Sequence, residues 1–177
     1  MNAADFAGIP SAVATHPALL RRILVLLASD PIAGKVSQGT VRDAALREVL
    51  RRFFTGVIDF SQAKVEVGIK LPRAGSPHSS DNSVFPSGWE ERLVRTQVSR
   101  FYNQAVLSTL IEQGAADCFV AHSSQESVSS QCSRLLAGRR HSALLLLDRL
   151  IRSYRDGDWD ADPKIPDHPH CTHTVQP

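Results

Sequence analysis

Apolar residues recur at three- and four-residue intervals in several stretches of the chain, a spacing that places them on one face of an α-helix. The pattern predicts helices over residues 17–29, 40–56, 87–113 and 142–154. The first of these is apolar on most sides, so we expect it to be buried. A shorter helix is predicted over residues 129–136, ending before a glycine.

Three other stretches have the character of strands. Residues 64–71 alternate apolar and polar side chains with period two, which is typical of a half-buried strand. Residues 116–122 and 171–176 are also predicted strands, whereas residues 73–86 are rich in proline and serine and predict an exposed loop. Together these elements predict an α+β fold that is mainly helical, with a small antiparallel sheet packed on the long helix of residues 87–113.

The same pattern divides the chain into two regions and a connection. We expect an N-terminal helical region with one strand (1–72), a loop or linker (73–86) and a C-terminal domain (87–177). The chain has 177 residues, of which 42% are hydrophobic and 21% charged. This amino-acid composition is typical of a globular protein. It is long enough to bury a core without metals or disulfides.

The net charge of +2 is too small to indicate a nucleic-acid partner by itself. Local arginine clusters are stronger candidates, and we expect contacts with a partner or with nucleic acid, or else solvated helix faces, at Arg47, Arg51, Arg139 and Arg140. Three widely spaced cysteines do not indicate a disulfide framework. The longest apolar runs fall short of the ~20 residues that a membrane span needs, so no membrane partner is expected.

The densest chemistry lies near the C-terminus, where His168, His170, Cys171 and His173 fall within six positions. Thiolate and imidazole groups are the ligands that zinc prefers. Cys132, Cys171, His173 and His168 are therefore candidate zinc ligands. The alternative is that Cys132 is a small buried side chain and the histidines lie on a solvated tail. The residues alone leave both interpretations open.

The order of several short motifs resembles the C-terminal domain of the phage Mu F-type head morphogenesis family. The resemblance covers about residues 87–177. The motifs are Arg95-Thr96-Gln97, Phe101-Tyr102-Asn103-Gln104-Ala105, Ser129-Ser130-Gln131-Cys132, Leu136-Ala137-Gly138-Arg139 and Pro166-x-His168-Pro169-x-Cys171-x-His173. No single motif is decisive, and the match lies in their order and approximate spacing.

The resemblance implies a non-enzymatic minor head protein of a tailed phage or prophage. Its partners would be portal and capsid proteins and packaged DNA, and it would reside in the virion head after assembly in the host cytoplasm. It also implies structural roles for Arg95, Asn103, Gly138 and Pro169. Arg95 and Asn103 lie a little over two helical turns apart, so we expect both to face the small sheet and to bind loop carbonyls.

The sequence departs from the family pattern at the cysteines. Ser129 occupies the position of the family's first cysteine and His173 that of its last. A cluster of four cysteines thereby becomes one serine, two cysteines and one histidine, and this change puts metal binding in question.

Two other function classes stay open. One is a small zinc-site enzyme, such as a metal-dependent nuclease, built around Cys132, His168, His170, Cys171 and His173. The other is a helical DNA-binding regulatory protein. The sequence contains no glycine-rich phosphate loop, Gly-x-Ser-x-Gly elbow or His-Glu-x-x-His pair, which favours the non-enzymatic interpretation.

Overall fold

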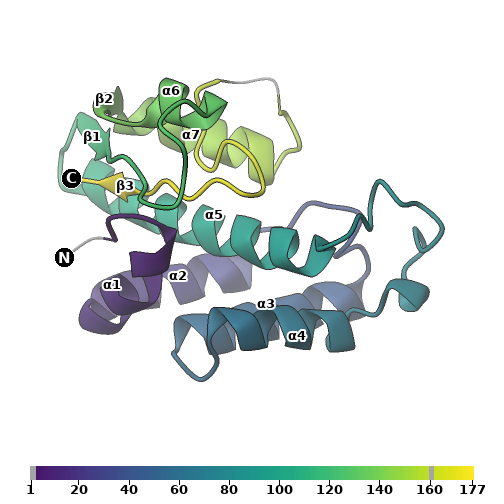
Figure 1. Cartoon of the computed structure of the whole chain (residues 1–177). Helices are drawn as coiled ribbons and strands as arrows, with labels where there is room; N and C mark the ends of the chain where they lie inside the picture. Colours follow the sequence, from purple (N-terminus) through teal and green to yellow (C-terminus); the bar gives the residue numbers. More distant parts are fainter. Residues whose placement is uncertain (1–2, 160–161) are drawn as a thin grey trace.

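Helix α5 (Trp89–Glu112) runs through the middle of the molecule, and the other elements pack on its two sides (Figure 1). A computed structural model describes residues 3–159 and 162–177. The N-terminal helices lie on one side of α5, and a three-stranded antiparallel sheet with two further helices lies on the other. The predicted class, a mainly helical α+β fold with a small sheet on a long helix, is confirmed.

The N-terminal half consists of helices. They are η1 (Phe6–Gly8), α1 (Ile9–Thr15), α2 (Pro17–Ser29), α3 (Thr40–Phe54), α4 (Phe60–Lys70) and the 3₁₀ turn η2 (Arg73–Gly75). Within the part of the chain that the structure describes, no single helix is long and apolar enough to cross a membrane. The bent pair Phe6–Thr15 and Pro17–Ser29 meets that length and composition test when its two helices are taken together.

Helix α4 corrects the strand predicted over residues 64–71. Asp59 accepts a hydrogen bond from the backbone N–H of Gln62, and the Gln62 side chain accepts one from the N–H of Asp59. This reciprocal capping satisfies backbone donors at the start of a helix. The buried side chains then follow at four-residue intervals: Ala63, Val67 and Leu71. The strand prediction was wrong. A strand would place Val65, Val67, Ile69 and Leu71 on one buried face, but Val65 and Ile69 are exposed.

The C-terminal half carries the sheet. Its elements are β1 (Asp117–Val120), α6 (Gln131–Leu136), β2 (Arg139–Ser142), α7 (Ala143–Tyr154) and β3 (Val175–Gln176). The strand order is β2-β1-β3, so β1 is central and pairs antiparallel with both neighbours. The strand predicted over residues 171–176 is correct for Val175 and Gln176, while residues 171–174 form neither strand nor helix. Strand β2 was not predicted.

The chain's N-terminal segment is built into the C-terminal half. The backbone N–H of Phe6 donates to Thr172 O at 2.8 Å, and that of Ala3 donates to the Tyr102 hydroxyl at 2.8 Å. The Thr174 hydroxyl donates to Ala3 O at 2.8 Å. The buried apolar side chains of both halves form one continuous cluster. The early segment therefore holds the final residues of the chain against α5.

A buried arginine fixes the loop that follows α2. The Arg100 guanidinium donates to Pro31 O at 2.9 Å and lies 3.5 Å from an Asp30 carboxylate oxygen. Gln104 donates to the same carboxylate at 2.7 Å. Burial lowers the pKa of Arg100 to about 10, although Asp30 opposes this shift. These contacts anchor residues 30 and 31, and with them the loop that begins there, to α5.

Candidate metal centre

Three segments bring four potential ligands together beside α5. Glu126 lies in the loop after β1, Cys132 in the first turn of α6, and Cys171 and His173 in the extended C-terminal segment. One ligand atom of each residue lies within 4.8 Å of the corresponding atoms of the others. The two cysteines and His173 are buried, and Glu126 is partly exposed.

The distances within this group match a tetrahedral zinc site. Atom Nδ1 of His173 lies 3.7 Å from Cys132 Sγ, 3.6 Å from Cys171 Sγ and 3.5 Å from Glu126 Oε2. Tetrahedral coordination with ordinary zinc–sulfur and zinc–nitrogen bond lengths separates the sulfur and nitrogen atoms by about 3.6 Å. The donor set of two thiols, an imidazole and a carboxylate also suits zinc. The residues present therefore fit this ion.

The far side of the His173 ring is held by Ser133, whose Oγ lies 3.2 Å from Nε2. When the Nε2–H group donates to this hydroxyl, the Nδ1 lone pair faces the two sulfurs. Metal-binding histidines commonly use the second nitrogen in this way. Burial lowers the pKa of His173, with Glu126 opposing the shift, so the ring is neutral and able to bind a metal.

His168 lies beside this group and also belongs to a second possible ligand group, with Cys132 and Asp167. Its Nε2 lies 3.2 Å from Cys132 Sγ and 3.3 Å from Glu126 Oε1, but its Nδ1 accepts the backbone N–H of His170 at 3.2 Å. A neutral imidazole that accepts at Nδ1 carries its proton on Nε2. In this hydrogen-bonding arrangement His168 donates to the cluster, and Glu126 supplies the fourth ligand atom of the first group.

Two of the acidic groups, Cys132 and Glu126, have lowered pKa values, and the third, Cys171, has a raised one. A hydrogen bond from Cys171 lowers the pKa of Cys132 to about 7, and the same contact together with burial raises the pKa of Cys171. Burial alone would raise the pKa of Glu126, but hydrogen bonds from Cys132 and Thr172 outweigh it, so this pKa is lowered. One thiolate and one carboxylate are thus accessible near neutral pH, as metal binding requires.

Local structure explains why Glu126 and not Ser129 belongs to the group. Both the N–H and the hydroxyl of Thr172 donate to Glu126 Oε2, at 3.3 and 3.1 Å. Ser129 is exposed and bonds to Ser127, two residues away in the same loop. Glu126 was missed because a glutamate six residues before a cysteine in a serine-rich stretch gives no recognisable ligand spacing.

Asn103 faces the small sheet as predicted, although its side chain binds a backbone N–H and not a loop carbonyl, and Arg95 does not face the sheet. Asn103 is fully buried, accepts the Val175 N–H at 2.8 Å and donates to Ser99 Oγ at 3.1 Å. Arg95 instead lies over the Phe6 ring, 4.6 Å from its centroid, and pairs with Glu91 at 3.1 Å. The expectation that Arg95 faces the sheet was wrong, because this side chain turns toward the N-terminal helices.

Gly138 and Pro169 lie where the chain changes direction. Gly138 has a φ of +71°, and a Cβ there would lie 2.6 Å from His122 Nε2. Its N–H donates to Val120 O at 2.8 Å, which links the end of α6 to β1. The Pro169 carbonyl accepts a long hydrogen bond, 3.5 Å, from the Thr96 hydroxyl on α5.

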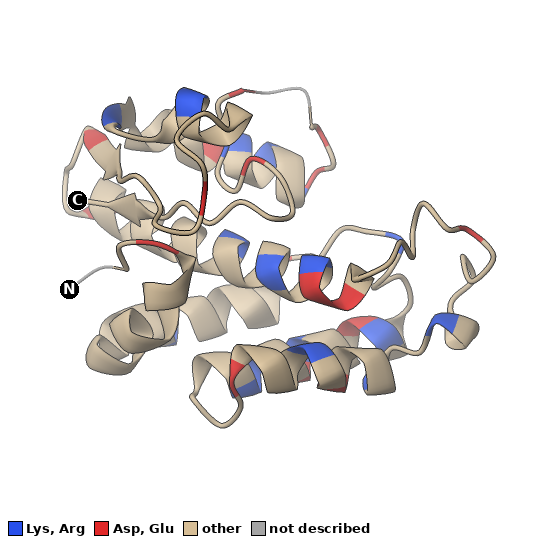
Figure 2. Cartoon of the chain, viewed as in Figure 1, with Lys and Arg blue, Asp and Glu red and all other residues tan. Residues whose placement is uncertain are grey.

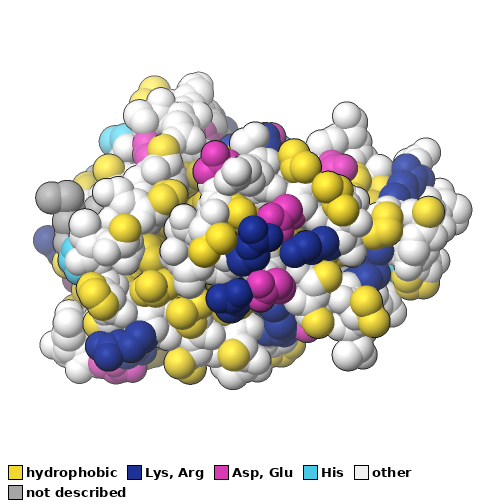
Figure 3. Space-filling model, turned by 90° about the horizontal axis from the view of Figure 1, so that it is seen from below, with side chains coloured by type: hydrophobic (Ala, Val, Ile, Leu, Met, Phe, Trp, Pro, Cys, Tyr) yellow, Lys and Arg dark blue, Asp and Glu magenta, His cyan; other side chains and the backbone are white. Residues whose placement is uncertain are grey.

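The predicted contact arginines fall into two groups. Arg47 bonds to Asp43 and to the carbonyls of Leu27 and Asp30, and Arg51 pairs with Glu48 at 2.8 Å. Positive and negative bands alternate along α3 and α4 in Figure 2, and the face in Figure 3 shows both signs mixed with hydrophobic side chains. The guanidinium groups of Arg47 and Arg51 thus already have carboxylate partners within the protein.

The arginines of the second group make no ion pair in the part of the chain that the structure describes. Arg139 and Arg140 on β2 and Arg134 on α6 are exposed, and none of them forms an ion pair within the described residues. Strand β2 is an edge strand, so its outer side is open to solvent in the described structure. Of the predicted contact residues, Arg139 and Arg140 are the ones available to a partner.

No protein-family model, curated protein or solved structure matches the chain. The resemblance to the Mu F-type family rests on the ordered motifs alone.

Proposed function

We propose that this chain is a non-enzymatic minor head protein of a tailed phage or prophage, of the Mu F type, whose C-terminal unit is closed by a zinc ion. The observation that carries the proposal is the meeting of Glu126, Cys132, Cys171 and His173. The segments that meet there include two that bear the family motifs, one around Cys132 and one from residue 166 to 173. Asn103, from a third motif, ties the same C-terminal segment to α5.

A structural role fits the ligand group better than a catalytic one. Four side chains are available for four positions, and three of them are buried, which leaves no open position for substrate. When bound, zinc supplies a cross-link between the loop after β1, α6 and the C-terminal segment. His168 adds a hydrogen bond to this group rather than acting as a base. These features support a closing function and weigh against the zinc-enzyme alternative.

The surface proposed to meet portal or capsid protein is the outer edge of β2 with Arg134, Arg139 and Arg140. Unpaired guanidinium groups favour an acidic protein surface or the phosphates of packaged DNA. The open edge of the sheet offers backbone hydrogen bonds to an extended segment of a partner. Arg51 on α3, with its carboxylate partner in place, serves as the natural comparison.

The metal is tested by purifying the protein without chelator and measuring bound zinc by mass spectrometry. We expect about one zinc ion per chain. Cys132→Ser and Glu126→Gln should lower this content, whereas Cys118→Ser should not, because Cys118 bonds to the His141 carbonyl outside the cluster. Clearly substoichiometric zinc in the wild-type protein would remove the metal from the proposal.

The partner is tested by capture of purified portal and major capsid proteins. The double variant Arg139→Glu/Arg140→Glu should lose capture, and Arg51→Glu should retain it. Equal loss in both variants would show that the contact is not at β2. Binding to duplex DNA that weakens steeply with salt, without any capture of head proteins, would replace the proposal with the DNA-binding regulator.

A further inference from the structure

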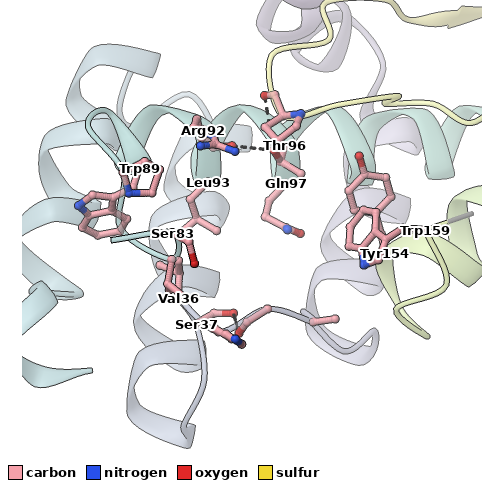
Figure 4. Close-up of a pocket in the computed structure, with 16 residues that line it drawn as sticks. Val36, Ser37, Ser83, Trp89, Arg92, Leu93, Thr96, Gln97, Tyr154 and Trp159 are labelled. Atoms are coloured by element: carbon pink, nitrogen blue, oxygen red, sulfur yellow. Dashed lines mark hydrogen bonds between the residues drawn. The ribbon is translucent and has the colours of Figure 1, made fainter. Parts of the chain in front are cut away.

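A cavity of about 470 Å³ lies between the N-terminal half of α5 and the loop of residues 33–37 (Figure 4). Trp89 lies at one end and Trp159 at the other. Pro169 also lines the cavity, so the site adjoins the segment of the candidate metal centre without using any of its ligands. The volume is within the range of small-molecule sites.

Aromatic rings form the two ends of this cavity. Trp89 makes an edge-to-face contact with Phe85 at 5.2 Å between centroids, and Trp159 makes one with Tyr154 at 4.9 Å. Tyr154 is anchored in turn, because its buried hydroxyl donates to Pro166 O at 2.8 Å. Such rings offer flat apolar surface at fixed positions, which suits a planar ligand.

The charge of the lining is one-sided. Lys35 and Arg92 are the charged side chains among the lining residues, and no aspartate or glutamate of residues 3–159 and 162–177 lines the cavity. Neither cation forms an ion pair within the described residues, in contrast to the arginines of α3. An anionic group on the ligand would therefore meet two available cations at the rim.

Gln97 supplies a polar contact inside the cavity. It is 4% exposed, and its side chain extends from α5 into the space between Leu93 and the Tyr154–Trp159 pair (Figure 4). Its Oε1 is buried without a hydrogen-bond partner in the described structure. An unpaired buried amide oxygen is costly, so a ligand that supplies a donor gains the bond that the protein lacks. A carboxamide offers an acceptor and two donors side by side.

We propose that this cavity binds a nucleotide. The base supplies a planar body for the aromatic ends and an edge with adjacent donor and acceptor groups for Gln97. The phosphate supplies the anion for Arg92 and Lys35. An aromatic carboxylate would satisfy the rings and the cations but would leave the Gln97 oxygen without a donor. The proposal does not depend on the head-protein function, because it uses none of the metal ligands or the β2 arginines.

The same chemistry can come from a free nucleotide or from the end of a single nucleic-acid strand. The test titrates the full-length protein with AMP, CMP, GMP and UMP and follows tryptophan fluorescence. Both tryptophans of the chain line this cavity, so the signal reports on it directly. Short oligonucleotides with and without a 5′-phosphate form the second arm of the experiment.

We expect saturable quenching by at least one nucleoside monophosphate, with about tenfold weaker binding of the matching nucleoside. Inorganic phosphate alone should not quench. Stronger binding of the 5′-phosphorylated oligonucleotide than of the mononucleotide would assign the site to a strand end, and the opposite order would assign it to a free nucleotide.

Two variants separate the contacts. Arg92→Gln should weaken binding of the nucleotide, though not to the level of the nucleoside because Lys35 still faces the phosphate, and should leave binding of the nucleoside unchanged. Arg21→Gln, at an exposed arginine outside the cavity, should change neither. Gln97→Met should weaken both ligands without loss of thermal stability, because the buried Oε1 of Gln97 has no hydrogen-bond partner among the described residues. No saturable quenching by any monophosphate, or equal affinities in wild type and Arg92→Gln, would overturn the proposal.

Discussion

The side-chain oxygen of Asn103, in the middle of α5, accepts a hydrogen bond of 2.8 Å from the backbone N–H of Val175. Both residues are fully buried. Val175 begins β3, which pairs with β1 through Val120 and Phe119. This single contact therefore connects the long helix to the edge of the sheet and sets the position of the segment that carries Cys171 and His173.

Replacing Asn103 tests that connection. Asn103→Ala leaves the Val175 N–H buried without an acceptor, and we expect a loss of ~1–3 kcal/mol in the free energy of unfolding. Ser99→Ala removes the other partner of Asn103 but keeps the bond to Val175, so it should cost less. Urea unfolding followed by circular dichroism measures both. Equal losses of unfolding free energy in the two variants would show that the hydrogen bond to Val175 contributes nothing beyond the bond to Ser99.

A second prediction concerns Gly138. Gly138→Ala should destabilise the protein by ~1–3 kcal/mol, because the residue has positive φ and the new Cβ would meet the His122 ring. Gly114→Ala is the matched control: its φ is +80° and nothing lies within 4 Å of its added Cβ. Thermal unfolding should show the larger loss for Gly138→Ala. Adding His122→Ala should recover part of the difference, and no recovery would refute the contact.

Helix α4 shows which part of the fold the sequence could predict and which part it could not. The three- and four-residue periodicity found the long helices, since each buries one broad face. Residues 64–71 fit both the period of a strand and that of a helix. Val65, Val67, Ile69 and Leu71 alternate with other residues, as in a strand, while Val67 and Leu71 are also four residues apart, as on one face of a helix. The capping pair Asp59 and Gln62 decides for the helix, and Val65 and Ile69 are left exposed.

The ligand group could be predicted only in part. Cysteine and histidine are recognisable as metal ligands from the sequence, so Cys132, Cys171 and His173 were candidates. The pairing of β3 with β1 brings the segment of Cys171 and His173 toward Cys132. The roles of Glu126 and His168 depend on one loop conformation and one backbone hydrogen bond to an imidazole nitrogen. Contacts of this kind arise from tertiary packing, so no local pattern encodes them.

The stability of the metal-free protein should depend on pH through His173. Burial lowers the pKa of His173 in the folded state below its usual value of 6.5. As the pH falls below 6.5, the His173 imidazole is therefore protonated in the unfolded chain before it is protonated in the folded protein. The stability that His173 contributes is complete above pH 6.5 and is lost as the pH falls toward the lower folded-state pKa. For one group the slope cannot exceed about 1.4 kcal/mol per pH unit.

This dependence is measured by urea unfolding between about pH 7 and 5 in the presence of a chelator. His173→Gln should flatten the slope. His170→Gln should change it less, because His170 is exposed, even though burial of part of its ring and nearby arginines also lower its pKa. An unchanged slope in His173→Gln would show that another group is responsible.

The last prediction decides which loop residue completes the metal centre. Glu126→Asp keeps the carboxylate but shortens the side chain by one methylene, which draws the oxygen away from its position 3.5 Å from His173 Nδ1. Ser129→Cys restores the cysteine at the position of the Mu F-type pattern, but Ser129 is exposed and bonded within its own loop. We therefore expect Glu126→Asp to bind zinc more weakly than wild type, and Ser129→Cys to match wild type, in competition with a chromophoric chelator. If Ser129→Cys gains affinity and Glu126→Asp leaves it unchanged, the loop folds back to place residue 129 at the centre, and Glu126 is not a ligand.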